Sequence, residues 1–84
     1  MLPVMQKIEH LFGNAVRKRR LAMGLSQEDF ADKAGIHRTY VSSIELGKVQ
    51  VSIRIAAQLA AALEVPLSEL WGDIERGQLG GGKR

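Results

Sequence analysis

The side chains best suited to binding chemistry lie between positions 38 and 46, in the segment RTYVSSIEL. If this segment is a helix, Val41, Ile44 and Glu45 share one side, because they lie three and four residues apart. The opposite side carries a guanidinium group and several hydroxyl groups, supplied by Arg38, Thr39, Ser42 and Ser43, together with Leu46. Such groups form hydrogen bonds readily. The segment therefore predicts a helix that is anchored by its apolar side and presents its polar side to a partner.

A shorter helix is expected just before this segment, ending in a tight turn. Ser26 can cap its first turn, with Asp29 three residues later completing a capping-box pattern. Gly35 suits a left-handed residue just past the helix end, and Gly47 stops the helix that follows. The apolar face of the first helix consists of Phe30, Ala31 and Ala34.

Two interpretations fit a pair of helices of this kind. One is a helix-turn-helix, whose second helix lies in the major groove of DNA. The other is an ordinary αα-hairpin with a solvated outer face. The distribution of charge along the chain favours the helix-turn-helix. Residues 1–54 hold nine Lys/Arg against five Asp/Glu, whereas residues 55–84 hold three against four, in a chain of net charge +3. A basic half that contains the candidate helix is typical of phosphate binding, although a solvated basic surface has the same charge.

A longer helix is expected from about His10 to Met23, with an apolar stripe formed by Phe12, Val16 and Met23. Arg20 falls on this stripe and therefore points toward the core, where an unpaired charge is costly. Glu45 is the matching acid, on the inner face of the polar helix. We predict an Arg20–Glu45 ion pair with a structural role. Arg17, on the same long helix, can reach solvent or phosphate.

The rest of the chain divides into a third strong helix, a short last turn and a tail. Ser52 can cap a helix over Ile53–Leu63, whose apolar side includes Ile53 and Leu59, and Val65-Pro66 breaks it. A final turn over Leu67–Trp71 can face the core or a partner subunit. The expected organisation is a flexible lead-in at 1–9, one domain at 10–71, and a flexible glycine-rich tail at 72–84.

Several function classes have little support. The chain of 84 residues has no cysteine, and His10 and His37 lie far apart, so no metal site is expected. Five serines are present, but neither histidine has an identifiable carboxylate to orient it, so we expect neither an enzyme nor a cofactor. No apolar run could span a bilayer and no signal pattern opens the chain, which predicts a cytoplasmic protein without a membrane partner.

Three stretches of the chain carry a family resemblance: Gly24-Leu25-Ser26-Gln27, then Ser43-Ile44-Glu45-Leu46-Gly47-Lys48, then Leu59-Ala60-Ala61-Ala62-Leu63-Glu64-Val65. With the two-helix segment between the first and second, they resemble the phage-repressor (Cro/C1, XRE) helix-turn-helix family over roughly residues 12–71. The resemblance implies an all-α, five-helix, lambda-repressor-like domain. It also implies a transcriptional regulator that binds double-stranded DNA as a two-fold homodimer.

Residue roles carry over by position, as implications of this resemblance. The structural Arg–Glu pair of the family falls on Arg20 and Glu45, and its phosphate-contacting Gln falls on Gln27. The base-contacting positions fall on Arg38, Thr39 and Ser43. Contacts to the DNA backbone or to flanking bases fall on Ser42, Tyr40 and Lys48. Arg17 is a further candidate for contact with the DNA backbone. The dimerising last helices imply an interface of Leu63, Val65, Leu67, Leu70 and Trp71.

The segment Gly-Ile-His-Arg-Thr-Tyr-Val-Ser-Ser-Ile-Glu is most similar to one branch, the controller proteins of restriction–modification systems. Controllers commonly carry Arg-Asn where this chain has Val49-Gln50, so one base contact is missing, and Leu46 occupies a usually polar position. This branch implies palindromic operators and RNA polymerase as a further partner. The alternative is an antitoxin or phage-type repressor of the same fold that acts partly through protein–protein interaction.

Overall fold

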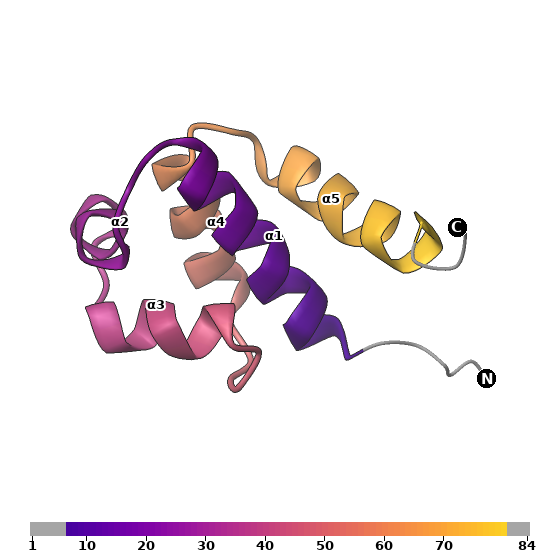
Figure 1. Ribbon diagram of the computed structural model, residues 1–84, viewed down its shortest axis with the longest axis horizontal. Coiled ribbons are helices and arrows are strands. Elements are labelled where there is room, and N and C mark those ends of the chain that lie inside the picture. Colours follow the sequence, from indigo (N-terminus) through magenta and orange to yellow (C-terminus); the bar gives the residue numbers. More distant parts are fainter. Residues whose placement is uncertain (1–6, 81–84) are drawn as a thin grey trace.

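The computed structural model describes residues 7–80 of the chain, and this part is built from helices without strands (Figure 1). The elements are α1 (Ile8–Ala22), α2 (Gln27–Ala34), α3 (Arg38–Glu45), α4 (Ile53–Ala62) and α5 (Leu67–Gly80). The predicted all-α, five-helix fold is therefore confirmed. Among residues 7–80, no helix is both long enough and apolar enough to cross a membrane.

Local signals set most of the helix ends. The Ser26 Oγ accepts the backbone N–H of Asp29 at 3.0 Å, and the Ser52 Oγ accepts that of Ile55 at 3.0 Å. These contacts satisfy N–H groups that lack a partner inside the helix. Gly35 ends α2 in the left-handed region at φ 73°, as expected for a residue past a helix end.

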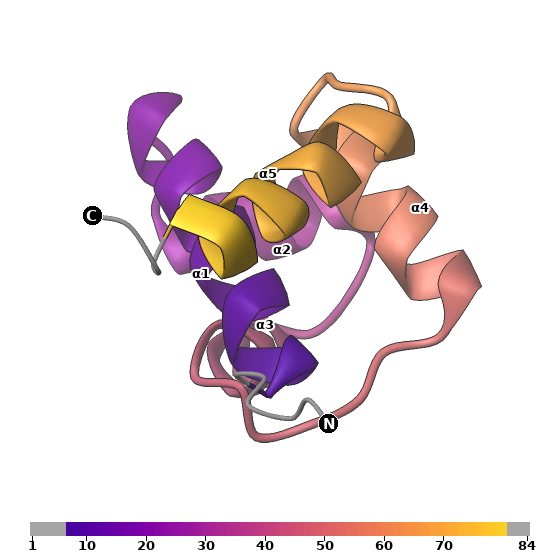
Figure 2. The ribbon, with the colours of Figure 1, turned by 90° about the vertical axis from the view of Figure 1, so that its right-hand side faces the viewer.

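α1 lies between the helix pair α2–α3 and the C-terminal helix α5 (Figure 1). It packs against α3 on one side and α5 on the other, while α2 packs against α3 and α4 (Figure 1). Seen from the side, α5 runs across α1, and α3 lies behind the start of α1 (Figure 2). A single apolar core forms between the helices, with Val16, Phe30, Val41, Ile44, Leu59, Leu70 and Ile74 as its largest fully buried side chains.

Two details of the predicted apolar faces were wrong. Met23 follows the end of α1 and is exposed, because the helix closes at Ala22 before the stripe reaches it. Ile53, expected on the inner side of its helix, is 83% exposed. It opens the first turn of α4, at the edge of the core. α1 also begins at Ile8, two residues earlier than expected.

The largest correction concerns the C-terminal part. Residues 72–84 were expected to form a flexible tail, but α5 continues through residue 72 as far as Gly80. Leu70 and Ile74 lie four residues apart on one face of α5, and both side chains are buried in the core. This burial stabilises the helix despite its glycines. Residues 81–84 of the predicted tail and residues 1–6 of the predicted lead-in lie outside the described part.

Candidate nucleic-acid interface

α3 separates an anchored side from an open side, as its sequence predicts. Val41, Ile44 and Glu45 are buried. Arg38 and Thr39 are exposed, and Ser42 and Ser43 are half-buried along the same outer side. The predicted outward orientation of the polar side chains is therefore confirmed. His37, the N-cap residue, makes no side-chain cap hydrogen bond. The first turn of α3 can thus donate its backbone N–H groups to an external acceptor.

The remaining residues predicted to contact DNA differ in exposure. Lys48 is exposed in the loop that follows Gly47, and Arg17 is exposed on α1. Tyr40, in α3, is half-buried and packs against the apolar core. Leu46 is exposed as the C-cap residue, just beyond the last turn of α3. The predicted DNA-contacting residues thus include three exposed cations, Arg17, Arg38 and Lys48, together with hydroxyl groups.

The predicted Arg20–Glu45 ion pair is present and buried. Arg20 Nε donates to Glu45 Oε2 at 2.7 Å, and Arg20 Nη2 donates to Glu45 Oε1 at 3.0 Å. The side chains are only 7% and 2% exposed, respectively. Arg20 Nη1 also donates to the carbonyl oxygen of Leu25 at 2.7 Å. Two parallel bonds and a third donor contact compensate the loss of water around both charges.

Gln27 has a partner that the sequence did not indicate. Its side-chain Nε2 donates to Glu45 Oε1 at 3.0 Å, across the corner between α2 and α3. Gln27 is the first residue of α2 and is half-buried. One hydrogen bond of the Gln27 side-chain amide, which was expected to contact phosphate, is thus made to Glu45 within the protein.

A second set of ion pairs, also absent from the sequence-based predictions, joins α1 to α5. Arg19 Nε donates to Asp73 Oδ2 at 2.5 Å, and Arg19 Nη2 donates to Glu69 Oε2 at 3.2 Å. The hydrogen bond from Arg19 lowers the pKa of the Asp73 carboxyl below its usual value. The spacing of Leu67, Leu70 and Ile74 is the signal that could have indicated this helix.

The predicted dimer interface is partly wrong. Leu63 and Leu70 are buried inside the chain, where a second subunit cannot reach them, because both side chains fill the core that α4 and α5 share. Val65 and Leu67 are half-buried and also pack against that core. Trp71, in contrast, is 47% exposed. Of the five predicted residues, only Trp71 offers a large free apolar surface.

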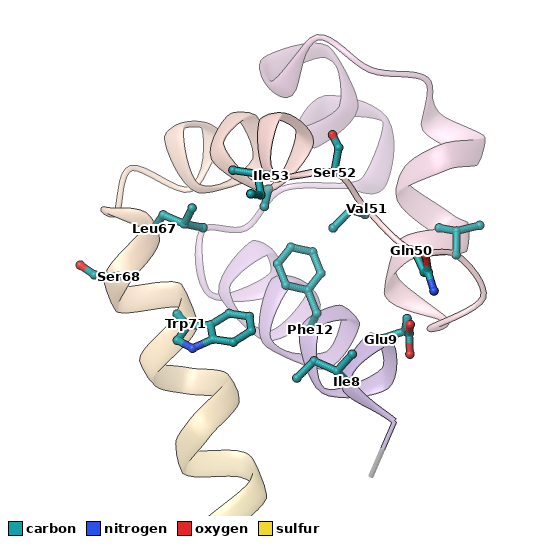
Figure 3. A pocket seen from close by; sticks show the side chains of 12 residues that line it. Ile8, Glu9, Phe12, Gln50, Val51, Ser52, Ile53, Leu67, Ser68 and Trp71 are labelled. Carbon is teal, nitrogen blue, oxygen red and sulfur yellow. The ribbon is translucent and has the colours of Figure 1, made fainter. Parts of the chain in front are cut away.

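An open apolar groove of about 760 Å³ surrounds this tryptophan (Figure 3). Its walls come from the start of α1, the loop 49–52 and the first turns of α4 and α5. Ile8 and Ile53, exposed by 40% and 83%, lie at the groove with Trp71. Glu9 is the sole charged residue among its lining side chains in the described part. The sequence-based predictions did not include this groove, because it forms where three separate segments of the chain meet.

Comparisons with known proteins agree with this geometry. A helix-turn-helix family profile matches residues 16–70. The control protein C.MunI of a Mycoplasma species is 45% identical over 73 residues, which are 86% of this chain and 99% of that protein. The restriction–modification controller protein C.AhdI of Aeromonas hydrophila is 40% identical, with a TM-score of 0.72 over 74% of this chain and 94% of that one. The clp gene regulator ClgR of Corynebacterium glutamicum, 20% identical, has the same fold, with a TM-score of 0.85 over 89% of this chain and 80% of that one.

Proposed function

The chain belongs to the helix-turn-helix (XRE) family of DNA-binding transcriptional regulators, and on this premise we propose that it binds palindromic operators as a homodimer. We propose further that it is the controller protein of a restriction–modification system, which its similarity to C.MunI and C.AhdI supports. Membership in this family agrees with the prediction that the protein is not an enzyme. RNA polymerase is the additional partner that an activating controller needs.

The observation that carries the proposal is the open polar side of α3, held from behind by Val41 and Ile44. In this proposal α3 enters the major groove, where Arg38 pairs with the O6 and N7 atoms of a guanine. Thr39 and Ser43 have shorter side chains and discriminate less between bases. Because the chain offers few strong base readers, sequence-dependent DNA shape contributes part of the specificity.

Contacts to the DNA backbone set the position of α3 in the groove. Arg17 and Lys48 are exposed cations outside α3, and Gln27 lies at the N-terminus of α2. A helix N-terminus favours an anion through its free N–H groups and its dipole. Ser42 and Tyr40 supply further contacts to phosphates or flanking bases. The contacts to phosphates carry no sequence information, so each of them strengthens binding to all duplexes alike.

We assign the homodimer interface to the groove around Trp71. None of the groove's lining residues in the described part belongs to α3, so a second copy can cover the groove and leave the polar side of α3 open. Burial of Ile8, Ile53 and Trp71 removes exposed apolar surface from water, which stabilises association. In a two-fold dimer the two α3 helices then lie in successive major grooves, about 34 Å apart.

The base-reading role is tested with two alanine variants. The wild-type chain first selects its preferred duplex from a random DNA library. Arg38→Ala should weaken binding to that duplex by about 1–3 kcal/mol and leave binding to a scrambled duplex almost unchanged. Lys48→Ala should weaken both duplexes alike. Arg76→Ala, which removes the same charge from α5, is the control. Equal loss on both duplexes for Arg38→Ala would exclude a role in base reading.

The dimer interface is tested by sedimentation of Trp71→Ser and Ile53→Ser. Both variants should shift the wild-type dimer toward monomer. Leu21→Ser is the matched control, because Leu21 is 51% exposed on α1 but does not line the groove. A wild-type chain that stays monomeric would contradict this assignment.

The apolar groove also fits the alternative function, an antitoxin whose exposed apolar surface covers a toxin. The two functions differ in their dependence on salt, because phosphate contacts make DNA affinity fall steeply as salt rises. A steep decrease supports the regulator. Genes for a methyltransferase and an endonuclease beside this one would support the controller role.

A further inference from the structure

Glu45 is shared by two side chains from two different helices. Its Oε1 accepts a hydrogen bond from Arg20 Nη2 and another from Gln27 Nε2, both at 3.0 Å. Its Oε2 accepts from Arg20 Nε at 2.7 Å. Glu45 is the last residue of α3, Arg20 belongs to α1 and Gln27 is the first residue of α2. One carboxylate therefore connects the DNA-facing helix to the residue at the start of the helix before it.

We propose that Glu45 is a positioning residue for the contact of Gln27 with the DNA backbone. This inference rests on the proposed function. The amide nitrogen of Gln27 carries two N–H groups, and Glu45 accepts one of them. The second N–H remains for a phosphate oxygen, from a side chain whose rotamer is already set. A side chain held in its bound conformation before binding loses less entropy when the complex forms.

The support for Gln27 is rigid because each part of it is held in place. The Glu45 side chain is 2% exposed and makes two hydrogen bonds with Arg20. Arg20 in turn donates to the carbonyl oxygen of Leu25 at 2.7 Å, two residues before Gln27. The same guanidinium thus holds both the carboxylate that orients Gln27 and the backbone that leads into α2.

The charges of this arrangement also suit an approaching phosphate. A lone carboxylate behind Gln27 would repel the DNA backbone. Here the Arg20 guanidinium neutralises Glu45 at close range, so the pair presents no net charge toward the duplex. The ion pair can therefore orient a phosphate ligand without weakening its binding.

A double-mutant cycle on DNA affinity tests the inference. Gln27→Ala is compared in the wild-type chain and in the Arg20→Met/Glu45→Met background, since apolar replacement of a buried ion pair often preserves the fold. The probes are a 30-base-pair duplex of random sequence and the duplex selected by the wild-type chain. In the wild-type background, Gln27→Ala should weaken binding to both probes about tenfold, as expected for loss of a hydrogen bond to a charged group. In the Met/Met background it should add less than twofold.

Thr39→Ala is the matched control for the same cycle. Thr39 lies on the outer side of α3 and its side chain makes no contact with Glu45 among the hydrogen bonds of the described residues. Its effect on affinity should be the same in both backgrounds. If the effects of Thr39→Ala and Gln27→Ala both disappear in the Met/Met background, the ion pair acts only by placing α3, and the inference is overturned. An unchanged effect of Gln27→Ala would overturn it as well.

A measurement on the wild-type chain keeps the test independent of how the variants fold. In NMR spectra of the free protein, the side-chain amide protons of Gln27 should show nuclear Overhauser contacts to the Glu45 side chain. Averaging of the Gln27 rotamers without such contacts would overturn the inference. Failure of the proposed function is distinguishable, because a wild-type chain that binds neither probe at low salt refutes DNA binding itself.

Discussion

Two neighbouring arginines on α1 hold the two parts of the molecule together in different ways. Arg20 binds Glu45 at the end of α3, and Arg19 binds Asp73 and Glu69 on α5. Because successive residues step about 100° around a helix, the two side chains point to different neighbours. The Arg20 pair is buried, whereas the Arg19 pairs remain partly open to water, with the Arg19 side chain 27% exposed.

Because the two arginines differ in burial, their ion pairs should contribute differently to the free energy of unfolding. Loss of one partner of a buried pair leaves the other charge without water, which is strongly destabilising. When one partner of a solvent-accessible pair is removed, water solvates the remaining charge, and the fold loses little stability. The helix-turn-helix part should therefore depend on its ion pair, whereas α5 should depend mainly on the burial of Leu70 and Ile74.

The largest expected effect comes from breaking the buried pair on one side. Glu45→Ala should lower the free energy of unfolding by about 3–5 kcal/mol, because Arg20 is left as an uncompensated buried charge. Urea denaturation followed by circular dichroism measures the change. Asp73→Ala is the comparison on the α5 side, and a loss equal to that of Glu45→Ala would contradict the distinction between the two pairs.

A smaller effect is expected from the glycines at which α1 packs against its two neighbours, because α1 lies closer to α3 than to α5 at these positions. A Cβ atom at Gly13 would lie 2.8 Å from the carbonyl oxygen of Glu45, and nearer still to that of Ile44. Gly13→Ala should therefore push α1 away from α3 and cost about 1–3 kcal/mol. A Cβ at Gly77 on α5 would meet Leu11 Cδ2 at 3.5 Å, an ordinary contact.

Gly77→Ala is thus the matched substitution for Gly13→Ala. It should raise the free energy of unfolding by about 0.5–1 kcal/mol, since alanine restricts the unfolded chain and favours a helix. Thermal unfolding of both variants gives opposite shifts in Tm if the approach of α1 to α3 is as close as the structure indicates. Two shifts of the same sign would refute this contrast.

The smallest effect is expected at the partly exposed Arg19–Asp73 pair, which joins α1 to α5. Asp73→Asn should cost about 0.2–1 kcal/mol at neutral pH, and less at high salt. Because Arg19 lowers the pKa of Asp73, the carboxylate stabilises the fold at pH values above its unfolded pKa, near 3.8. This contribution is lost as the pH falls through the lower folded value. The difference between wild type and Asp73→Asn should accordingly shrink below about pH 4. A difference that grows on acidification would contradict the direction of the pKa shift.

Much of the first four helices was predictable from local residues. Ser26, Ser52 and Gly35 act within one helical turn of their own positions, so their sequence context is sufficient. The Arg20–Glu45 pair was also predictable, since each charge interrupts an apolar face and needs an opposite charge. The bond from Gln27 to Glu45 was not, because a polar residue at a helix start has many possible partners.

The C-terminal part was harder to predict, because its structure depends on contacts between residues far apart in the chain. Five glycines after Trp71 favour a flexible tail by composition, yet the burial of Leu70 and Ile74 and the contact of Asp73 with Arg19 outweigh them. Leu63 and Leu70 looked equally suited to a core and to an interface. Only the packing of α4 and α5 showed which side of each helix faces inward.

The amino-acid sequence by itself determined the first four helices, the serine and glycine residues at their ends, the polar side of α3 and the need for a buried ion pair. These features depend on periodicity and on contacts between near neighbours in the chain. The tertiary structure alone decided that α5 reaches Gly80, that Arg19 binds Asp73, and that Ile8, Ile53 and Trp71 form one groove. Each of these depends on segments far apart in the chain, and helix packing sets their distance in space.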